Sequence, residues 1–382
     1  MSDVPTGRLT RRALLAIGVS GAGGAMLAGD ALARADGGGE SAGTPAASGW
    51  YVPADTTRHE RTWMSWPARR DIWGSQLPGV QHDVARIART VAKYEPVSMI
   101  ARPRETRKAA AACGPSVHIV PMANDDLWMR DAGPVFLING RGGLAGLDLN
   151  FNGWGGKQVH VNDARVARKI LDLLGIERVR APFVAEGGAL ETDGHGTAMA
   201  TESSIVNANR NPGHSKAQIT SWLRGYLGVR KVVWVPGLKG QDITDDHIDG
   251  LARFIHPGRV VVSQPADPHV SNAWARSGRQ ALRILSAATD AGRHKLHCVV
   301  SRESSRIPPG HDPNTFVNTY VNWYACNGAV LIPAFDDPGA DTEARELVAH
   351  LYPERAVEQL RIDSIAAGGG GIHCATQEQP LA

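Results

Sequence analysis

Apolar residues recur along residues 50–382 with the spacing of helices that are each followed by a short strand. The clearest helical stripe precedes the strand-like run 96–100, and its members are Val80, Val84, Ile87 and Val91. Residues three, four and seven apart share one face of a helix, whereas a short β-branched run between polar neighbours is typical of a strand. The pattern therefore predicts a helix that is followed directly by a strand.

Four further helix-then-strand units follow the same rule. The stripes are Val166, Ile170, Leu173 and Leu174; Ile219, Trp222, Leu223 and Tyr226; Leu282 and Leu285; and Leu347, Val348 and Leu351. Gly175 and Gly228 follow the second and third stripes, as expected for residues that end helices. Strand-like runs lie at 231–235 and 297–300, with extra ones at 260–262 and 329–333. Repeated units predict one mixed α/β domain of similar modules, with an ordinary open α/β sheet as the alternative.

Length and composition narrow the class of protein. The chain has 382 residues, of which 42% are hydrophobic and 21% charged, with 43 Gly and 23 Pro. These values are typical of a globular domain with many turns. The formal charge of +3 is small and the basic residues are scattered, which argues against nucleic acid as a partner. A dinucleotide-binding sheet is disfavoured because no Gly-x-Gly-x-x-Gly turn joins an early strand to a helix.

The amino terminus has the layout of an export signal. Arg11 and Arg12 precede a weakly apolar stretch that runs to about Leu32 and is followed by small-x-small cleavage sites. Paired arginines favour the twin-arginine route, with an ordinary secretory signal as the alternative. We expect a signal over 1–35, a flexible leader over 36–48, a single folded domain over 49–382, and an extracellular or periplasmic location. No later segment approaches the roughly 20 apolar residues of a membrane span.

The four cysteines are too few for a disulfide scaffold in this length, and none forms a Cys-x-x-Cys pair. Cys113, Cys298 and Cys326 lie in apolar or strand-like stretches and are expected to be buried free thiols. Cys374 differs because it follows the glycine run 368–371, which would let the backbone approach a bound molecule closely. Cys374 is therefore a candidate nucleophile, with an inert buried thiol as the alternative.

A thiol with an ordinary pKa of about 8.5 needs a base or a cation to become reactive. His247 is the candidate base, because in an extended segment His247 and Asp249 point to one face and Ile248 to the other. His373 adjoins the cysteine, but in an extended segment it would turn away from Cys374. His247 and Asp249 could also hold a divalent metal; no second His-rich segment accompanies them, so no metal is expected.

Three carboxylates indicate the substrate. Asp131, Glu186 and Asp249 come from separate polar segments that contain Gly, which is where loops carry sites. Together beside one thiol, they would supply more negative charge than peptide hydrolysis needs. A guanidinium does need it, because it is permanently cationic and pairs its N–H donors with carboxylates. We therefore predict a small cationic guanidino substrate, whose charge would also favour the thiolate.

These segments resemble the agmatine deiminase and Porphyromonas-type peptidylarginine deiminase family. Ordered motifs that span most of residues 50–380 carry the resemblance. They are HERTWMSWP at 59–67, DLWMRDAGP at 126–134, FNGWGGK at 151–157, EGG at 186–188, TE at 201–202 with NRNP at 209–212, HID at 247–249 and GGIHC at 370–374.

The resemblance implies a five-bladed α/β propeller of pseudo-fivefold ββαβ modules, a pentein, with the active site at its centre. It also implies that neither a metal nor an organic cofactor takes part. Trp128 would form an apolar wall beside the bound cation. Packing in the core is the alternative role for this side chain.

The roles of the polar residues also follow from the resemblance. Asp131 and Asp249 would clamp the guanidinium nitrogens, and Glu186 would hold His247 and the substrate in place. Cys374 would attack the guanidinium carbon to form a covalent thiouronium. His247 would protonate the departing ammonia and then activate the water that resolves the intermediate.

The chain departs from the family pattern at two positions and leaves several activities open. Gly371 stands where the family usually has Asn, and Asp246 stands where Gly is common. The leading interpretation is hydrolysis of agmatine to N-carbamoylputrescine and ammonia. The alternatives are deimination of free or peptide-borne arginine, amidino transfer to an amine, and a secreted binding protein without catalysis. The sequence is compatible with a homo-oligomer.

Overall fold

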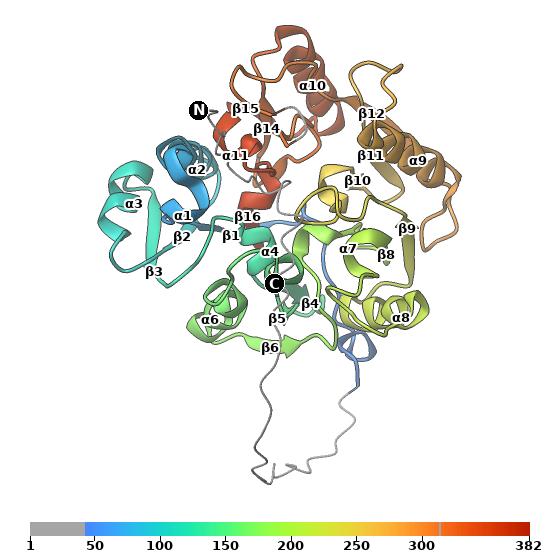
Figure 1. The fold of residues 1–382 in the computed structure, drawn as a ribbon. Helices are drawn as coiled ribbons and strands as arrows, with labels where there is room; N and C mark the ends of the chain where they lie inside the picture. The colour runs from blue at the N-terminus through green and yellow to red at the C-terminus, as the bar shows by residue number, and fades with distance from the viewer. Residues whose placement is uncertain (1–42, 313–314) are drawn as a thin grey trace, which may run out of the picture.

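The computed structural model describes residues 43–312 and 315–382, and it is a five-bladed α/β propeller (Figure 1). Within these ranges the strands form five small sheets around a centre, and the longer helices lie at the periphery. The predicted pentein architecture is confirmed. The predicted signal at 1–35 lies outside the described residues.

Four blades share one ββαβ order. They are β4 (Val135–Ile138), β5 (Leu144–Asp148), α6 (Val166–Leu174), β6 (Glu177–Arg180); β7 (Leu190–Thr192), β8 (Thr197–Thr201), α8 (Lys216–Leu227), β9 (Lys231–Val235); β10 (Ala252–His256), β11 (Arg259–Gln264), α9 (Ala273–Ala287), β12 (His297–Arg302); and β13 (Tyr324–Cys326), β14 (Ala329–Ala334), α10 (Pro338–Leu351), β15 (Ala356–Arg361). In each blade the first two strands are antiparallel and the third is parallel to the second. A parallel pair requires a crossover, which the helix provides.

The remaining blade joins the two ends of the described chain. Its elements are β1 (His59–Ser65), α2 (Leu77–Val91), β2 (Val97–Ala101), α3 (Thr106–Cys113), β3 (Val117–Pro121) and β16 (Thr376–Pro380). β16 pairs antiparallel with β1, and β2 and β3 extend the sheet in parallel. β16 lies near the centre of the ring (Figure 1), and it begins two residues after Cys374.

Short helices fill the connections between these elements. They are η1 (Pro45–Ser48), α1 (Arg70–Trp73), η2 (Gly74–Gln76), α4 (Met129–Ala132), α5 (Gly153–Gly156), η3 (Asp163–Arg165), η4 (Gly187–Ala189), α7 (Glu202–Ile205), η5 (Ile248–Gly250), α11 (Asp363–Ala367) and η6 (His373–Ala375), where η marks a 3-10 helix. Several of them carry the polar segments singled out in the sequence.

The predicted apolar stripes face the blade cores. The four members of the α2 stripe are completely buried. Gly175 and Gly228 adopt the left-handed conformation and end α6 and α8, as expected. Leu173 was wrongly placed in its stripe, because it lies on the solvent side of α6 and is 58% exposed.

The folded region begins a few residues before the expected boundary. η1 lies in the stretch expected as leader, and its backbone accepts hydrogen bonds from Gly49 and Trp50. Gly225 of α8 leaves room for Thr44, which packs directly against it. The four cysteines are free, with Cys113 and Cys326 buried and Cys298 half-buried. No helix in the two described ranges has the length and apolarity needed to cross a membrane.

Candidate active site

Five residues predicted from separate segments meet at the centre of the propeller. Asp131 lies in α4, Glu186 precedes η4, His247 and Asp249 flank the start of η5, and Cys374 lies in η6. Helix α4 contacts η4 and η6, and η4 contacts η5. The imidazole and the three carboxylates are buried, whereas Cys374 is half-buried. The predicted convergence of these side chains is therefore present in the structure.

Cys374 opens onto a cavity of about 460 Å³. Asp131, His247 and Asp249 line the same cavity. The Sγ atom of Cys374 is 3.5 Å from Oδ2 of Asp249. Burial would raise the pKa of Asp249, but the hydrogen bond and the charge of His373 lower it to about 2. An ionised carboxylate therefore lies beside the thiol.

His247 lies between two carboxylates. Its Nε2 atom is 3.3 Å from Oε2 of Glu186, and its Nδ1 atom is 3.7 Å from Oδ1 of Asp131. Burial alone would lower the pKa of His247, but the charge of Asp131 and the hydrogen bond to Glu186 raise it to about 9. The ring is therefore an imidazolium at neutral pH, and it can donate a proton into the cavity.

Glu186 contacts the His247 ring with one carboxylate oxygen and Arg210 with the other. Nε of Arg210 donates to Oε1 of Glu186 at 2.7 Å, and Nη1 donates to Asp245 at 2.9 Å. Burial would raise the pKa of Glu186, but the charges of Arg210 and His247 lower it below its ordinary value. Glu186 is not among the described residues that line the cavity. The structure thus shows Glu186 holding His247, but not the direct substrate contact that the resemblance implied.

Gly188 leaves open the space between the reactive side chains. Its N–H donates to Oδ1 of Asp131 at 3.2 Å, and Nε1 of Trp154 donates to the other oxygen of Asp131 at 2.8 Å. A Cβ at Gly188 would lie 2.7 Å from Nδ1 of His247. It would also lie 2.9 Å from Asp131 and 3.0 Å from Asp249. Glycine is required here because a side chain would enter this space.

The cavity continues along an acidic wall. Asp242, Asp246, Asp267 and Glu303 contribute to it, and no Lys or Arg is found among the described residues of its lining. Asp246 has φ +68°, a left-handed conformation that is uncommon outside Gly, and its Oδ2 accepts a hydrogen bond from Ser277. The departure from the family pattern thus adds a carboxylate directly before His247.

Trp128 packs in the core. The side chain is 1% exposed and is not among the described residues that line the cavity. Its Nε1 donates to Asp126 at 2.9 Å, and its ring lies so close to Gly370 that a Cβ there would collide with it. Of the two roles expected for Trp128, the structure shows core packing behind the glycine run.

The local backbone differs from expectation although the side chains converge. Residues 248–250 and 373–375 form 3-10 helices, whereas extended segments were expected. In the described ranges neither turn pairs with a strand in a sheet, and local bonds such as Leu251 N–H to the carbonyl of Ile248 at 2.9 Å satisfy the backbone instead. Ile248 is buried as expected, and His373 turns away from the cavity.

Two supporting residues were missed in the sequence. Arg210 lies in the NRNP motif at 209–212, but the sequence does not indicate its partner. Asn322 lies in no motif, yet its Oδ1 accepts from the N–H of Cys374 at 3.3 Å and its Nδ2 donates to the carbonyl of Asp249 at 3.2 Å. A Cβ at Gly371 would collide with Asn322. A side chain at position 371 would therefore displace Asn322, which Gly371 avoids.

Several known proteins are similar to this chain over most of its length. The profile of the Porphyromonas-type peptidyl-arginine deiminase family matches residues 51–380. The chain is 38% identical to the agmatine deiminase of Stutzerimonas stutzeri over 363 residues, which cover 88% of this chain and 97% of that protein. It is 36% identical to the agmatine deiminase of Pseudomonas aeruginosa, with the same coverage.

The solved structure of the agmatine deiminase of Enterococcus faecalis has the same fold. It superposes with a TM-score of 0.85 at 28% identity and covers 90% of this chain and 99% of its own. Together with the family profile over residues 51–380, these matches confirm the resemblance found in the motifs. The chain belongs to the Porphyromonas-type peptidyl-arginine deiminase family.

Proposed function

We propose that this protein hydrolyses agmatine to N-carbamoylputrescine and ammonia, with Cys374 as the covalent nucleophile. The observation that carries the proposal is the acidic cavity at Cys374, in whose described lining neither Lys nor Arg occurs. Agmatine has a guanidinium at one end and an ammonium at the other, and both are cationic at neutral pH. A cavity with carboxylates beside the thiol and along its wall matches such a dication.

The acidic wall of the cavity favours agmatine over the alternative substrates. Free arginine carries an α-carboxylate beside its α-ammonium, and in the described lining that carboxylate would lie among like charges with no Lys or Arg to pair with it. Peptide-borne arginine has neutral amides in place of the second charge and would gain nothing from Asp246 or Glu303. The two relatives named above, from Stutzerimonas stutzeri and Pseudomonas aeruginosa, are both named agmatine deiminase.

The first half of the reaction forms a covalent intermediate. Asp131 and Asp249 hold the guanidinium, and its positive charge favours ionisation of Cys374, whose proton leaves to solvent. The thiolate attacks the guanidinium carbon and forms a C–S bond. The C–N bond then breaks, and His247 gives its proton to the departing nitrogen. Ammonia leaves, and an S-alkylthiouronium remains on Cys374.

The second half of the reaction regenerates the thiol. Neutral His247 takes a proton from water, and the resulting hydroxide attacks the thiouronium carbon. The C–S bond breaks and its electron pair returns to Cys374. The proton of the added hydroxyl passes to the thiolate, which regenerates the thiol and leaves a neutral ureido product. Since this product has lost the guanidinium charge, it binds the two aspartates more weakly than the substrate and is released.

Export is the second part of the proposal. It rests on Arg11, Arg12 and the apolar stretch after them, which lie outside the described residues. The full chain is expressed beside an Arg11→Lys, Arg12→Lys variant, and deiminase activity is measured in the fractions outside and inside the cytoplasm. We expect external activity only with the arginines in place. External activity that is unaffected by the substitutions would indicate another route.

The decisive experiment measures ammonia and ureido product from agmatine, free arginine and an arginyl peptide, with the wild-type protein and Cys374→Ala. We expect agmatine to have the highest kcat/KM and Cys374→Ala to be inactive on all three. Turnover of the peptide above agmatine would identify a peptidylarginine deiminase. No turnover of any substrate would refute deimination, and full activity of Cys374→Ala would refute the covalent mechanism alone.

A further inference from the structure

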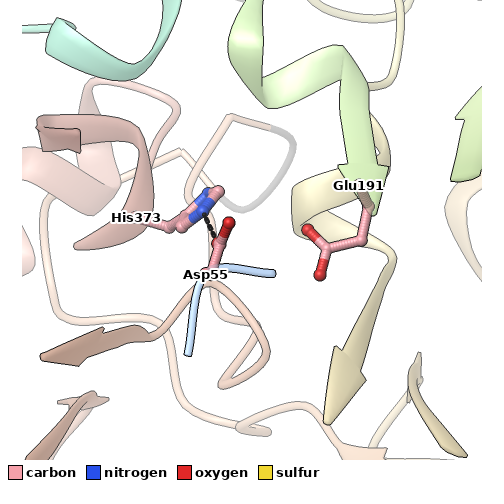
Figure 2. Close-up of side chains that lie close together, drawn as sticks. All are labelled: Asp55, Glu191 and His373. Atoms are coloured by element: carbon pink, nitrogen blue, oxygen red, sulfur yellow. Dashed lines mark hydrogen bonds and ion pairs between the residues drawn. The ribbon is translucent and has the colours of Figure 1, made fainter. Parts of the chain in front are cut away.

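A second histidine is held between two carboxylates behind the nucleophile. Nδ1 of His373 is 2.8 Å from Oδ2 of Asp249, and Nε2 is 2.9 Å from Oδ2 of Asp55. Figure 2 shows the ring of His373 directed at Asp55, with Glu191 on the other side of that carboxylate. The side chain is 1% exposed, so these two oxygens account for the polar contacts of its ring.

Each ring nitrogen of His373 faces a carboxylate oxygen that can accept a hydrogen bond. A neutral imidazole has one donor and one acceptor, and the acceptor would direct its lone pair at an ionised carboxylate. Burial would raise the pKa of Asp55, but Arg130 and His373 lower it well below its ordinary value. Since Asp249 is ionised as well, the doubly protonated ring, which donates in both directions, is the form that satisfies both contacts.

The charged groups around His373 belong to one connected network. They are Asp249 at η5, Asp55 ahead of β1, Arg253 on β10, Glu191 on β7 and Arg130 on α4. Nη2 of Arg253 contacts Oδ2 of Asp55 at 2.5 Å, and its Nε donates to Glu191 at 2.8 Å. His373 thus connects Asp249, which lines the cavity, to Asp55 and, through Asp55, to the buried Arg253.

A metal is the competing explanation for this cluster. Asp55, Glu191 and His373 form the one group in the described chain whose potential ligand atoms all lie within 4.8 Å of one another (Figure 2). Arg253, however, already pairs with both carboxylates, and the N–H of Phe254 occupies the second oxygen of Glu191 at 2.9 Å. The positive charge that a divalent ion would supply is already present as a guanidinium and an imidazolium.

We propose that His373 is a positioning residue of the deiminase reaction, which holds Asp249 in the orientation that receives the guanidinium and favours the thiolate of Cys374. This inference rests on the proposed function. Asp249 touches both partners through one oxygen, since its Oδ2 is 2.8 Å from His373 and 3.5 Å from Cys374. The imidazolium fixes that oxygen and offsets its charge, which would otherwise oppose ionisation of the adjacent thiol.

Two substitutions separate these effects. In His373→Asn the amide nitrogen replaces Nδ1 and still donates to Asp249, whereas in His373→Gln it replaces Nε2 and reaches only Asp55. Neither variant carries the positive charge. We expect KM for agmatine to rise roughly tenfold in His373→Gln and less in His373→Asn, with kcat changed less than KM in both.

Alkylation of Cys374 by iodoacetamide, followed across pH by peptide mass spectrometry, gives a readout without turnover. We expect the midpoint of alkylation to move up by about one pH unit in both variants, because both lack the imidazolium. If wild-type protein does not turn over agmatine, the proposed function fails, but this measurement still tests His373. Variants that lower thermal stability while KM and the alkylation midpoint stay unchanged would show a purely structural role and overturn the proposal.

A double-mutant cycle tests the connection to Asp55. Asp55→Asn should raise KM a few-fold in the wild-type background and have no further effect with His373→Gln, because the two act through one contact. Independent, multiplying effects would overturn the connection.

Metal analysis of the purified protein tests the competing explanation. A stoichiometric ion that is lost in His373→Asn would replace the proposal with a metal site. Thermal unfolding verifies that each variant is folded, and His373→Asn remains informative if His373→Gln does not fold.

Discussion

His247 and His373 each lie between two carboxylates, but they do so at different distances and with different access. The contacts of His247 are 3.3 and 3.7 Å and the residue lines the cavity, whereas those of His373 are 2.8 and 2.9 Å and the residue is sealed off behind it. A loosely held ring that faces substrate can deliver its proton. A tightly held ring with both nitrogens occupied can only orient its neighbours. A histidine between two carboxylates is thus suited to proton transfer at position 247 and to orienting its neighbours at position 373.

The largest predicted effect separates the two histidines. His247→Gln removes the proton donor to ammonia, so kcat for agmatine should fall by about 10²- to 10⁴-fold with little change in KM. His373→Asn should affect KM more than kcat. Steady-state kinetics of both variants measure the contrast, and equal losses of kcat would show that the two histidines do not differ in role.

Gly188 tests whether the space between the side chains near His247 is needed. Gly188→Ala would place a methyl group 2.7 Å from Nδ1 of His247 and within 3.0 Å of both aspartates. We expect kcat/KM to fall about 100-fold, because the reacting groups are displaced from their positions. Gly339→Ala in α10, where a Cβ meets nothing within 4 Å, is the matched control and should behave as wild type. A fully active Gly188→Ala protein would contradict this geometry.

The alkaline limb of the pH dependence of the reaction should report on His247. The pKa of His247 is raised from 6.5 to about 9, so the imidazolium and kcat/KM should be lost as pH rises through about 9. Glu186→Gln removes one of the charges that raise this pKa, so the alkaline limb should move down by about one unit. His373→Asn should leave this limb in place. The raised pKa also predicts that the free energy of unfolding declines between pH 6.5 and 9.

The smallest predicted effect concerns the acidic wall next to His247. Asp246→Asn should raise KM for agmatine by about two- to fivefold and leave KM for butylguanidine, which lacks a second cation, unchanged. Asn tolerates positive φ, so the backbone at +68° is kept. Asp246→Gly removes the same charge and relieves the backbone, so it should match the KM of Asp246→Asn with higher stability. A rise in KM for both substrates would indicate displacement of His247 instead.

Much of the fold was predictable because each blade repeats a local pattern. The α2 stripe is buried as its periodicity indicates, and Gly175 and Gly228 end their helices as expected. Leu173 shows the limit of this approach, since periodicity cannot distinguish the edge of a stripe from its centre. The ring closure by β1 and β16 has no local signal, because the two strands are more than 300 residues apart.

The reacting groups of the site were predictable from the sequence, but the residues that hold them in place were not. Residue types named the nucleophile, the imidazole and the carboxylates, because only certain groups can bind a guanidinium and attack its carbon. Asn322 and Arg210 act through hydrogen bonds to residues far away in the chain, and no spacing in the sequence indicates such partners. The 3-10 turns at 248–250 and 373–375 likewise form where the backbone pairs with no strand of the described sheets, which local spacing does not indicate.

The order of residues thus specified the modules, the family and the groups that react. The tertiary structure decided which histidine reaches the cavity, which carboxylates flank it, and that Trp128 and Glu186 lie behind the surface that substrate meets. The reason is physical: side-chain chemistry is a property of each residue, whereas distance and burial, which set the pKa of His247 and the pairing of His373, exist only once separate blades are packed around one centre.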